Sequence, residues 1–294
     1  MTDGTAPARA PLADWLALIR FSHTVFALPF ALLALFVATD GRPPLRVLVL
    51  CVLAMVAART AAMAYNRWLD RAIDARNPRT RNREIPRGAI APRQALALAL
   101  IAGAGFVVVA AWLAPICGWL ALPTLALLFG YSHAKRFTAS CHLWLGAALG
   151  LAPAAAWLAA HGAIEPTLVA ALVLGLGVML WVAGFDILYA CQDADFDRRE
   201  GLHSWPARLG IPNALRLARA LHAAAALGFL AFGFVAALGW IWFVGVLLAS
   251  GLLALQHRIV KADDLSRVNL AFFTLNGVVG LWMLAVGLLD LWLL

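Results

Sequence analysis

The chain has 294 residues, of which 64% are hydrophobic and only 13% are charged, and its mean hydropathy is +0.85. A water-soluble domain of this length carries far more charge on its surface, so the composition excludes one and indicates an integral membrane protein. The formal net charge is +8, but the basic residues crowd into short connections between apolar stretches, which is typical of membrane topology and argues against nucleic acid as a partner.

Nine apolar stretches are long enough to cross a bilayer, which takes about 20 helical residues. We therefore predict an all-α integral membrane protein with nine transmembrane helices in a single domain, residues 1–294. Residues 1–14 are expected to form a flexible cytoplasmic N-terminus without a removable signal peptide. The predicted spans are 15–39, 43–66, 93–113, 116–133, 141–161, 166–190, 212–238, 240–258 and 268–292.

The connections between these spans alternate in charge. Arginine and lysine are concentrated after the second, fourth, sixth and eighth spans, whereas the opposite connections carry little beyond Arg42 and Arg46. The positive-inside rule places the basic connections in the cytoplasm. We therefore expect the N-terminus inside and, after nine crossings, the C-terminus outside.

A cluster of polar side chains closes the second span. Asn66, Asp70 and Asp74 recur at intervals of four and so share one face of a helix. A carboxylate near hydrocarbon is costly unless it is paired or bound to a cation, and oxygen ligands at this spacing suit Mg²⁺. The alternative is local pairing with Arg67 and Arg71.

A basic, proline-containing loop follows this cluster and includes Arg83. Its cations could bind the oxygens of a diphosphate, or they could orient the chain by contacting lipid head groups. Arg59 differs, because it lies inside the second span, seven residues before Asn66. A buried arginine needs an anionic partner, and a cluster aspartate or a bound substrate would serve.

A second acidic cluster closes the sixth span. Its side chains recur at intervals of three, four and four, at Asp186, Tyr189, Asp193 and Asp197. They share one face if the helix continues. Asp195 points away from that face, toward solvent or Arg199. The two clusters end spans that run in the same direction, as an internally duplicated bundle would place them.

The chain has only three tyrosines, and their positions are informative. Tyr65 and Tyr189 lie beside the acidic clusters, and Tyr131 opens the basic motif that contains Lys135 and Arg136. This placement favours ring or hydroxyl chemistry at one shared site, such as stabilisation of a carbocation by Tyr131 or Tyr189. An aromatic belt at the membrane interface is the alternative.

Together these motifs resemble those of the UbiA superfamily of membrane-embedded aromatic prenyltransferases. The resemblance covers nearly the whole chain. It implies a nine-helix bundle around a central cavity, two Mg²⁺ ions, and transfer of an isoprenoid chain from a diphosphate to an aromatic ring. The motifs that carry it are Asn66-xxx-Asp70-xxx-Asp74 with Asn77-Pro78-Arg79-Thr80, Tyr131-xxx-Lys135-Arg136-x-Thr138, and Asp186-xx-Tyr189-xxx-Asp193-xxx-Asp197.

Spacing and resemblance together give a set of predicted site residues. The predicted metal ligands are Asn66, Asp70, Asp74, Asp186, Asp193 and Asp197. The predicted catalytic groups are Asp70, Asp74, Asp193, Asp197, Tyr131 and Tyr189. The predicted diphosphate-binding cations are Arg83, Lys135 and Arg136. The predicted binding residues for an aromatic acceptor with a carboxylate are Arg20, His23 and Arg59.

Residues 184–189 and 201–204 resemble a bacterial subgroup that prenylates 4-hydroxybenzoate in ubiquinone-type biosynthesis, which implies a polyprenyltransferase of the bacterial inner membrane. Some similar proteins act instead on a dihydroxynaphthoate in the futalosine route to menaquinone, and the sequence leaves both acceptors open. An ion-coupled transporter is the alternative from another class, although its carboxylates would be expected near the middle of the membrane. No obligate protein partner is evident.

Overall fold

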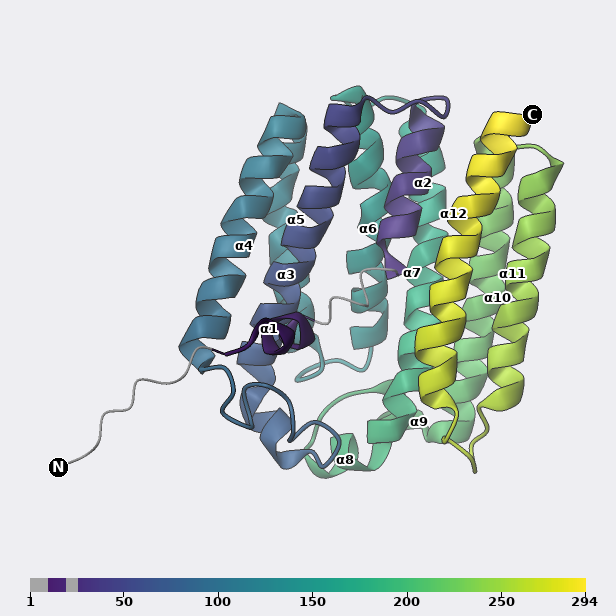
Figure 1. Cartoon of the computed structure of the whole chain (residues 1–294). Helices are drawn as coiled ribbons and strands as arrows, with labels where there is room; N and C mark the ends of the chain where they lie inside the picture. The colour runs from purple at the N-terminus through teal and green to yellow at the C-terminus, as the bar shows by residue number, and fades with distance from the viewer. Residues whose placement is uncertain (1–9, 20–25) are drawn as a thin grey trace.

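The computed structural model describes residues 10–19 and 26–294, and within them the fold is all-helical, as predicted (Figure 1). Eight helical segments in this part of the chain are long and apolar enough to cross a membrane. Their helices are α3 (Leu45–Arg76), α4 (Pro92–Leu113), α5 (Pro115–Ala134), α6 (Cys141–His161), α7 (Leu168–Ala190), α10 (Ile211–Val235), α11 (Trp240–Ile259) and α12 (Asn276–Leu293).

The predicted first span, 15–39, differs from the structure. α1 (Leu12–Leu18) is a separate short helix, residues 20–25 lie outside the described part, and α2 (Leu28–Ala38) has only 11 residues. Pro29 stands in the first turn of α2, where a residue without a backbone N–H starts a helix more readily than it continues one. The predicted count of nine is therefore approximate, with α2 as a short ninth element.

Each long helix packs against the next along the chain, and α2 lies between α12 and α6 (Figure 1). Glycines make the close contact between α6 and α7 possible. A Cβ atom on Gly150 would lie 2.5 Å from the carbonyl oxygen of Gly175, and one on Gly146 would lie 2.3 Å from that of Met179. Small residues let membrane helices approach closely, so this crossing depends on their lack of side chains.

Both acidic clusters lie at one end of the bundle, which we call the polar end. There α3 ends, and the chain after α7 passes through a 3-10 turn (Cys191–Asp193) into α8 (Ala194–Arg199) and α9 (Trp205–Leu209) (Figure 1). The second cluster therefore spans three helical segments. The prediction that its side chains share one face had assumed a single continuous helix. Despite the tight 3-10 turn, the side chains of the second cluster still line the same pocket.

A π-helical turn (Leu270–Leu275) precedes α12. Asn276 follows it directly: its Nδ2 donates to the carbonyl of Phe272 and its Oδ1 accepts from Trp181 Nε1, at 3.2 and 2.9 Å. Phe272, within the turn, stacks on Tyr189 with ring centroids 4.2 Å apart. Such bulges are frequent at functional sites, and this one shapes the wall of the central cavity.

Candidate active site

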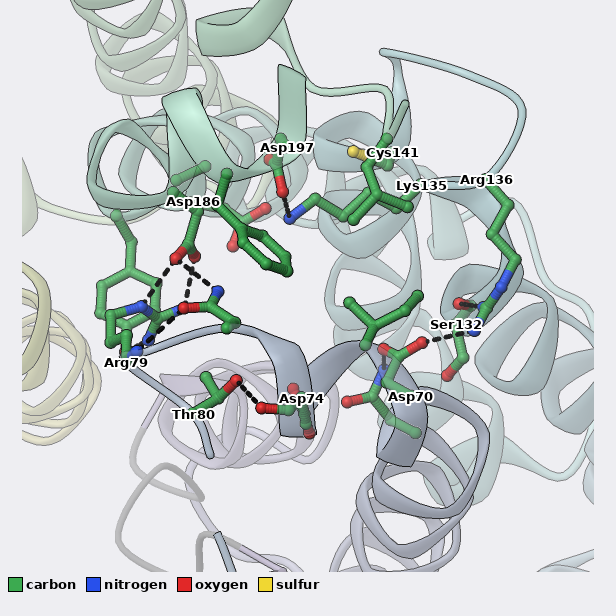
Figure 2. A pocket seen from close by; sticks show the side chains of 18 of the residues that line it. Asp70, Asp74, Arg79, Thr80, Ser132, Lys135, Arg136, Cys141, Asp186 and Asp197 are labelled. Atoms are coloured by element: carbon green, nitrogen blue, oxygen red, sulfur yellow. Dashed lines mark hydrogen bonds and ion pairs between the residues drawn. The ribbon is translucent and has the colours of Figure 1, made fainter. Parts of the chain in front are cut away.

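The two acidic clusters face each other across one polar pocket of about 170 Å³ at the polar end of the bundle. Figure 2 shows Asp70 and Asp74 on one side and Asp186 and Asp197 on the other, with Lys135 reaching Asp197. The sequence-predicted residues in its lining are Asn66, Asp70, Asp74, Arg83, Tyr131, Lys135, Arg136, Asp186, Tyr189, Asp193 and Asp197. The fold thus joins side chains from α3, α5 and the α7–α8 segment, which are far apart in sequence.

Four of the five carboxylates in this pocket each pair with an arginine or lysine. The pairs are Arg136–Asp70 at 2.8 Å, Arg83–Asp74 at 2.7 Å, Lys135–Asp197 at 2.8 Å, and Arg79–Asp193. Buried charges without partners cost several kcal/mol each, so these pairs are what allows the acids to lie here. The lining holds five carboxylates and four such cations, and the fifth carboxylate, Asp186, pairs with His142.

The environment keeps two of these cations charged. Burial by itself lowers the pKa of Lys135, but the ion pair with Asp197 and the nearby Asp193 outweigh burial and raise it above its ordinary value. The pKa of Arg79 is raised in the same way: burial alone lowers it, but the hydrogen bond to Asp193 and the charges of Asp193 and Asp74 together outweigh burial. Both side chains are therefore cationic at neutral pH and suited to binding an anion.

The polar pocket adjoins an apolar cavity inside the bundle, the proximal chamber, of about 280 Å³. The residues that line both spaces, and so form the junction between them, are Asn66, Arg83, Tyr131, Asp186 and Tyr189. Arg59 lies in the wall of the proximal chamber beside Asn66, as its spacing predicted. The site is therefore charged at one end and apolar at the other.

A second apolar cavity, the distal chamber, continues from the proximal one and has a volume of about 330 Å³. Met55, Phe106 and Ala152 line both chambers, so the two are continuous. On α3 the lining runs from Asn66 to Cys51, fifteen residues apart, which corresponds to about 22 Å along a helix. The lining is therefore long enough to follow an extended hydrocarbon chain.

The three tyrosines have different environments. Tyr65 lies outside this pocket, with its hydroxyl 3.0 Å from His133 Nε2, so the prediction that all three meet at one site is wrong for Tyr65. The Tyr189 hydroxyl accepts a hydrogen bond from Arg79 at 2.8 Å, and the Arg79 guanidinium also lies over its ring, 5.0 Å from the centroid. Tyr131 lines the junction and makes no hydrogen bond within the described part of the chain. Of the three tyrosines, Tyr131 therefore has its hydroxyl available to a ligand.

The remaining predicted residues have separate outcomes. Arg20 and His23 lie outside the described residues. Asp195 is 83% exposed and points away from the pocket, as predicted, but its partner is Arg198, at 2.9 Å, and not Arg199. An i,i+3 pair on the short helix α8 brings Arg198 to the same face as Asp195.

Sequence reasoning missed three side chains that support the second cluster. Asn77 Nδ2 donates to Asp193 at 3.0 Å and Arg79 binds the same carboxylate; the stretch Asn77-Pro78-Arg79-Thr80 contained that signal. His142 Nδ1 lies 2.7 Å from Asp186 Oδ2. A histidine at the start of an apolar span, just after a basic motif, was the available signal for it.

The oxygen-rich lining fits a hard divalent cation such as Mg²⁺. Asp74 Oδ2 is buried, has no hydrogen-bond partner in the described part of the chain, and lies 4.0 Å from Arg67 Nη1. Among the described residues, no three His, Cys, Asp or Glu side chains converge on one point. Mg²⁺ usually takes one or two carboxylates and completes its coordination with water and phosphate oxygens, so this donor set suits a metal that binds together with a diphosphate.

Known proteins are similar to this chain in both sequence and fold. A protein from Aromatoleum aromaticum named 4-hydroxybenzoate octaprenyltransferase is 32% identical over 285 residues, which cover 93% of this chain and 92% of that protein. Another of the same name from Azoarcus sp. is 33% identical, covering 78% of each. Two different relatives thus align along most of their length.

Solved structures give the same result. An apo UbiA homolog from Aeropyrum pernix superposes with a TM-score of 0.82 at 36% identity, covering 90% of this chain and 96% of that one. A UbiA homolog from Archaeoglobus fulgidus bound to GPP and Mg²⁺ shares the fold, with a TM-score of 0.71 at 20% identity, covering 93% and 98%. Residues 27–278 also match the model of the UbiA prenyltransferase family. The chain therefore belongs to the UbiA prenyltransferase family.

Proposed function

We propose that this protein transfers a polyprenyl chain from a polyprenyl diphosphate to an aromatic acid, with 4-hydroxybenzoate as the acceptor in ubiquinone-type biosynthesis. The observation that carries the proposal is the junction between the charged pocket and the two apolar chambers. A substrate with a diphosphate head and an isoprenoid tail matches both parts. The names of the relatives supply the acceptor, and the family favours an enzyme over a transporter.

Mg²⁺ fits the head of this site. For two ions we propose five of the six predicted ligands, Asn66, Asp70 and Asp74 on one wall and Asp193 and Asp197 on the other. We do not assign the sixth, Asp186, to a metal, because it pairs with His142. When bound, the ions would neutralise the charge that develops on the leaving diphosphate. Arg83, Lys135 and Arg136 now pair with those carboxylates, and they would exchange them for the non-bridging oxygens of the diphosphate.

The protein's own residues then account for the transfer. With the diphosphate in the polar pocket, the C1–O bond of the substrate lies at the junction, where Tyr131 can stabilise the allylic cation with its ring and hydroxyl dipole. The C1–O bond breaks with its electrons leaving on the diphosphate, the aromatic ring attacks C1, and the ring then passes a proton to the released diphosphate. The apolar wall excludes water, which would otherwise capture the cation.

Arg59 is our candidate for binding the acceptor carboxylate, because it lies in the proximal chamber beside the junction. The same roles for Arg20 and His23 stay predictions. Tyr189 differs from Tyr131, since its ring is already covered by Arg79 on one side and contacts Phe272. We therefore assign Tyr189 to holding Arg79, and Tyr131 to contact with the substrate.

The protein is a multi-pass inner-membrane protein, and we propose that its polar end faces the cytoplasm. The basic loops gather at that end, in accord with the positive-inside rule. The proposed N-terminus is inside and the C-terminus outside. A soluble aromatic acid would then reach the junction from the cytoplasm, while the lipid tail stays within the bilayer.

Purified protein in detergent, given a radiolabelled polyprenyl diphosphate and Mg²⁺, tests the proposal with two acceptors, 4-hydroxybenzoate and a dihydroxynaphthoate. Prenylated 4-hydroxybenzoate should form, and Asp70→Ala and Asp193→Ala should abolish it. Asp195→Ala is the matched control, because that exposed residue lies outside the pocket. If only the dihydroxynaphthoate is prenylated, it is the acceptor in place of 4-hydroxybenzoate. No product from either acceptor would refute the proposed function.

A further inference from the structure

Asp186 differs from the other acids of the polar pocket. The other four each pair with an arginine or lysine, whereas Asp186 has only His142 as an ion-pair partner within the described residues. Its side chain is 19% exposed, and that of His142 is 2% exposed. In that part of the chain Asp186 therefore has no arginine or lysine to release to a diphosphate, and its contact with His142 uses only one of its two oxygens.

His142 is fixed from both sides. Its Nδ1 lies 2.7 Å from Asp186 Oδ2, and its Nε2 lies 3.4 Å from the backbone nitrogen of Trp205. A carboxylate oxygen can only accept, so Nδ1 carries a proton and donates it to Asp186, while Nε2 faces the backbone N–H of Trp205. The ring also stacks on that of Trp205, with centroids 5.5 Å apart. His142 therefore holds one oxygen of Asp186 and leaves Oδ1 without a hydrogen bond in the described part of the chain.

The place of Asp186 in the cavity determines what Oδ1 can contact. Asp186 lines both the polar pocket and the proximal chamber, as does Tyr131. The proposed reaction brings C1 of the prenyl donor to this junction, so the attacking ring must lie beside it. Arg59, in the wall of the same chamber, would hold the carboxylate at the other end of that ring.

We propose that Asp186, oriented by His142, accepts a hydrogen bond from the phenolic hydroxyl of the aromatic acceptor, so that His142 is a positioning residue for acceptor recognition. This inference rests on the proposed function and names the group that recognises the acceptor hydroxyl. The hydrogen bond involves no transfer of the proton. It holds the carbon next to the hydroxyl against C1 and increases the electron density of the ring. Asp186 then serves the acceptor, whereas the paired acids serve the metal and the diphosphate.

Equilibrium binding of 4-hydroxybenzoate and of benzoate tests this inference, because the two ligands differ only in the hydroxyl. Binding is measured on the full-length protein with Mg²⁺ and a thiolo-diphosphate analogue of the prenyl donor, which does not ionise. A hydrogen bond to a charged group should make the wild-type protein bind 4-hydroxybenzoate about 10- to 100-fold more tightly than benzoate. His142→Ala and Asp186→Asn should remove this preference and leave the affinity for benzoate within about twofold of wild type.

Matched variants separate positioning from folding. His142→Gln should restore the preference, since glutamine offers one donor to Asp186 and one acceptor to the Trp205 N–H. His161→Gln, at the opposite end of the same helix, should change nothing. In turnover assays, His142→Ala should raise the KM of the acceptor and leave the KM of the polyprenyl diphosphate unchanged.

Two results would overturn the inference. Equal loss of affinity for both ligands in His142→Ala would assign the histidine to stability alone. A higher Mg²⁺ requirement in Asp186→Asn, with the preference for the hydroxyl intact, would make Asp186 a metal ligand. Failure of the wild-type protein to prenylate any phenolic acid would refute the proposed function itself. That result differs from the two above, which concern only the variants.

Discussion

Substituting Ala152 by phenylalanine provides the sharpest test of how the substrate tail is held. Ala152 is 8% exposed and lines both the proximal and the distal chamber, so a ring at this position would narrow the passage between them. A ten-carbon geranyl chain is expected to end within the proximal chamber, of about 280 Å³. A forty-carbon octaprenyl chain must continue into the distal chamber.

Two effects could determine how far kcat/KM for octaprenyl diphosphate falls, and their magnitudes differ greatly. Each buried methylene is worth about 0.8 kcal/mol when it leaves water. The displaced tail would move into lipid, however, so this contribution nearly cancels. The steric cost of overpacking remains, at about 1 to 3 kcal/mol. We therefore expect kcat/KM for octaprenyl diphosphate to fall about 5- to 150-fold, and that for geranyl diphosphate to stay within about twofold.

The assay measures initial rates with the two diphosphates at saturating acceptor. Ala147→Phe is the control, because Ala147 lies on the same helix and lines none of the three described cavities. Equal loss with both donors would mean that Ala152→Phe damages the fold. An unchanged rate with octaprenyl diphosphate would show that the tail leaves the cavity before the distal chamber, and would refute this reasoning.

The other predictions concern the helix contacts and the metal. Gly150→Val should lower the thermal unfolding temperature in detergent, because a Cβ there would lie 2.5 Å from the carbonyl oxygen of Gly175, whereas Gly251→Val, which meets open space, should be tolerated. Asp290→Ala should destabilise the protein by about 1 to 2 kcal/mol, since the carboxylate caps α11 by accepting from the backbone N–H of Trp242 at 2.9 Å, and Asp290→Asn should cost less. A chelator should abolish product formation and added Mg²⁺ should restore it; full activity in the chelator would contradict the proposed metal.

Much of the fold could be predicted from local sequence. Hydropathy and helix breakers gave the membrane class and eight of the spans, because a segment of about 20 apolar residues has few alternatives to crossing a bilayer. The first span was mispredicted, since its apolar composition concealed the start of α2 at Leu28–Ala38. Hydropathy averages over a window and does not detect where a helix begins within it.

The candidate site followed from sequence only in part. The intervals between Asn66, Asp70 and Asp74 determined by themselves that three polar side chains share a face, because helical periodicity is a local property. Only the tertiary structure decided which cation meets which acid, as for Arg79 and Asp193, which are 114 residues apart. It also excluded Tyr65 and joined His142 to Asp186. Such contacts depend on how separate helices pack, and no short-range pattern in one chain encodes that arrangement.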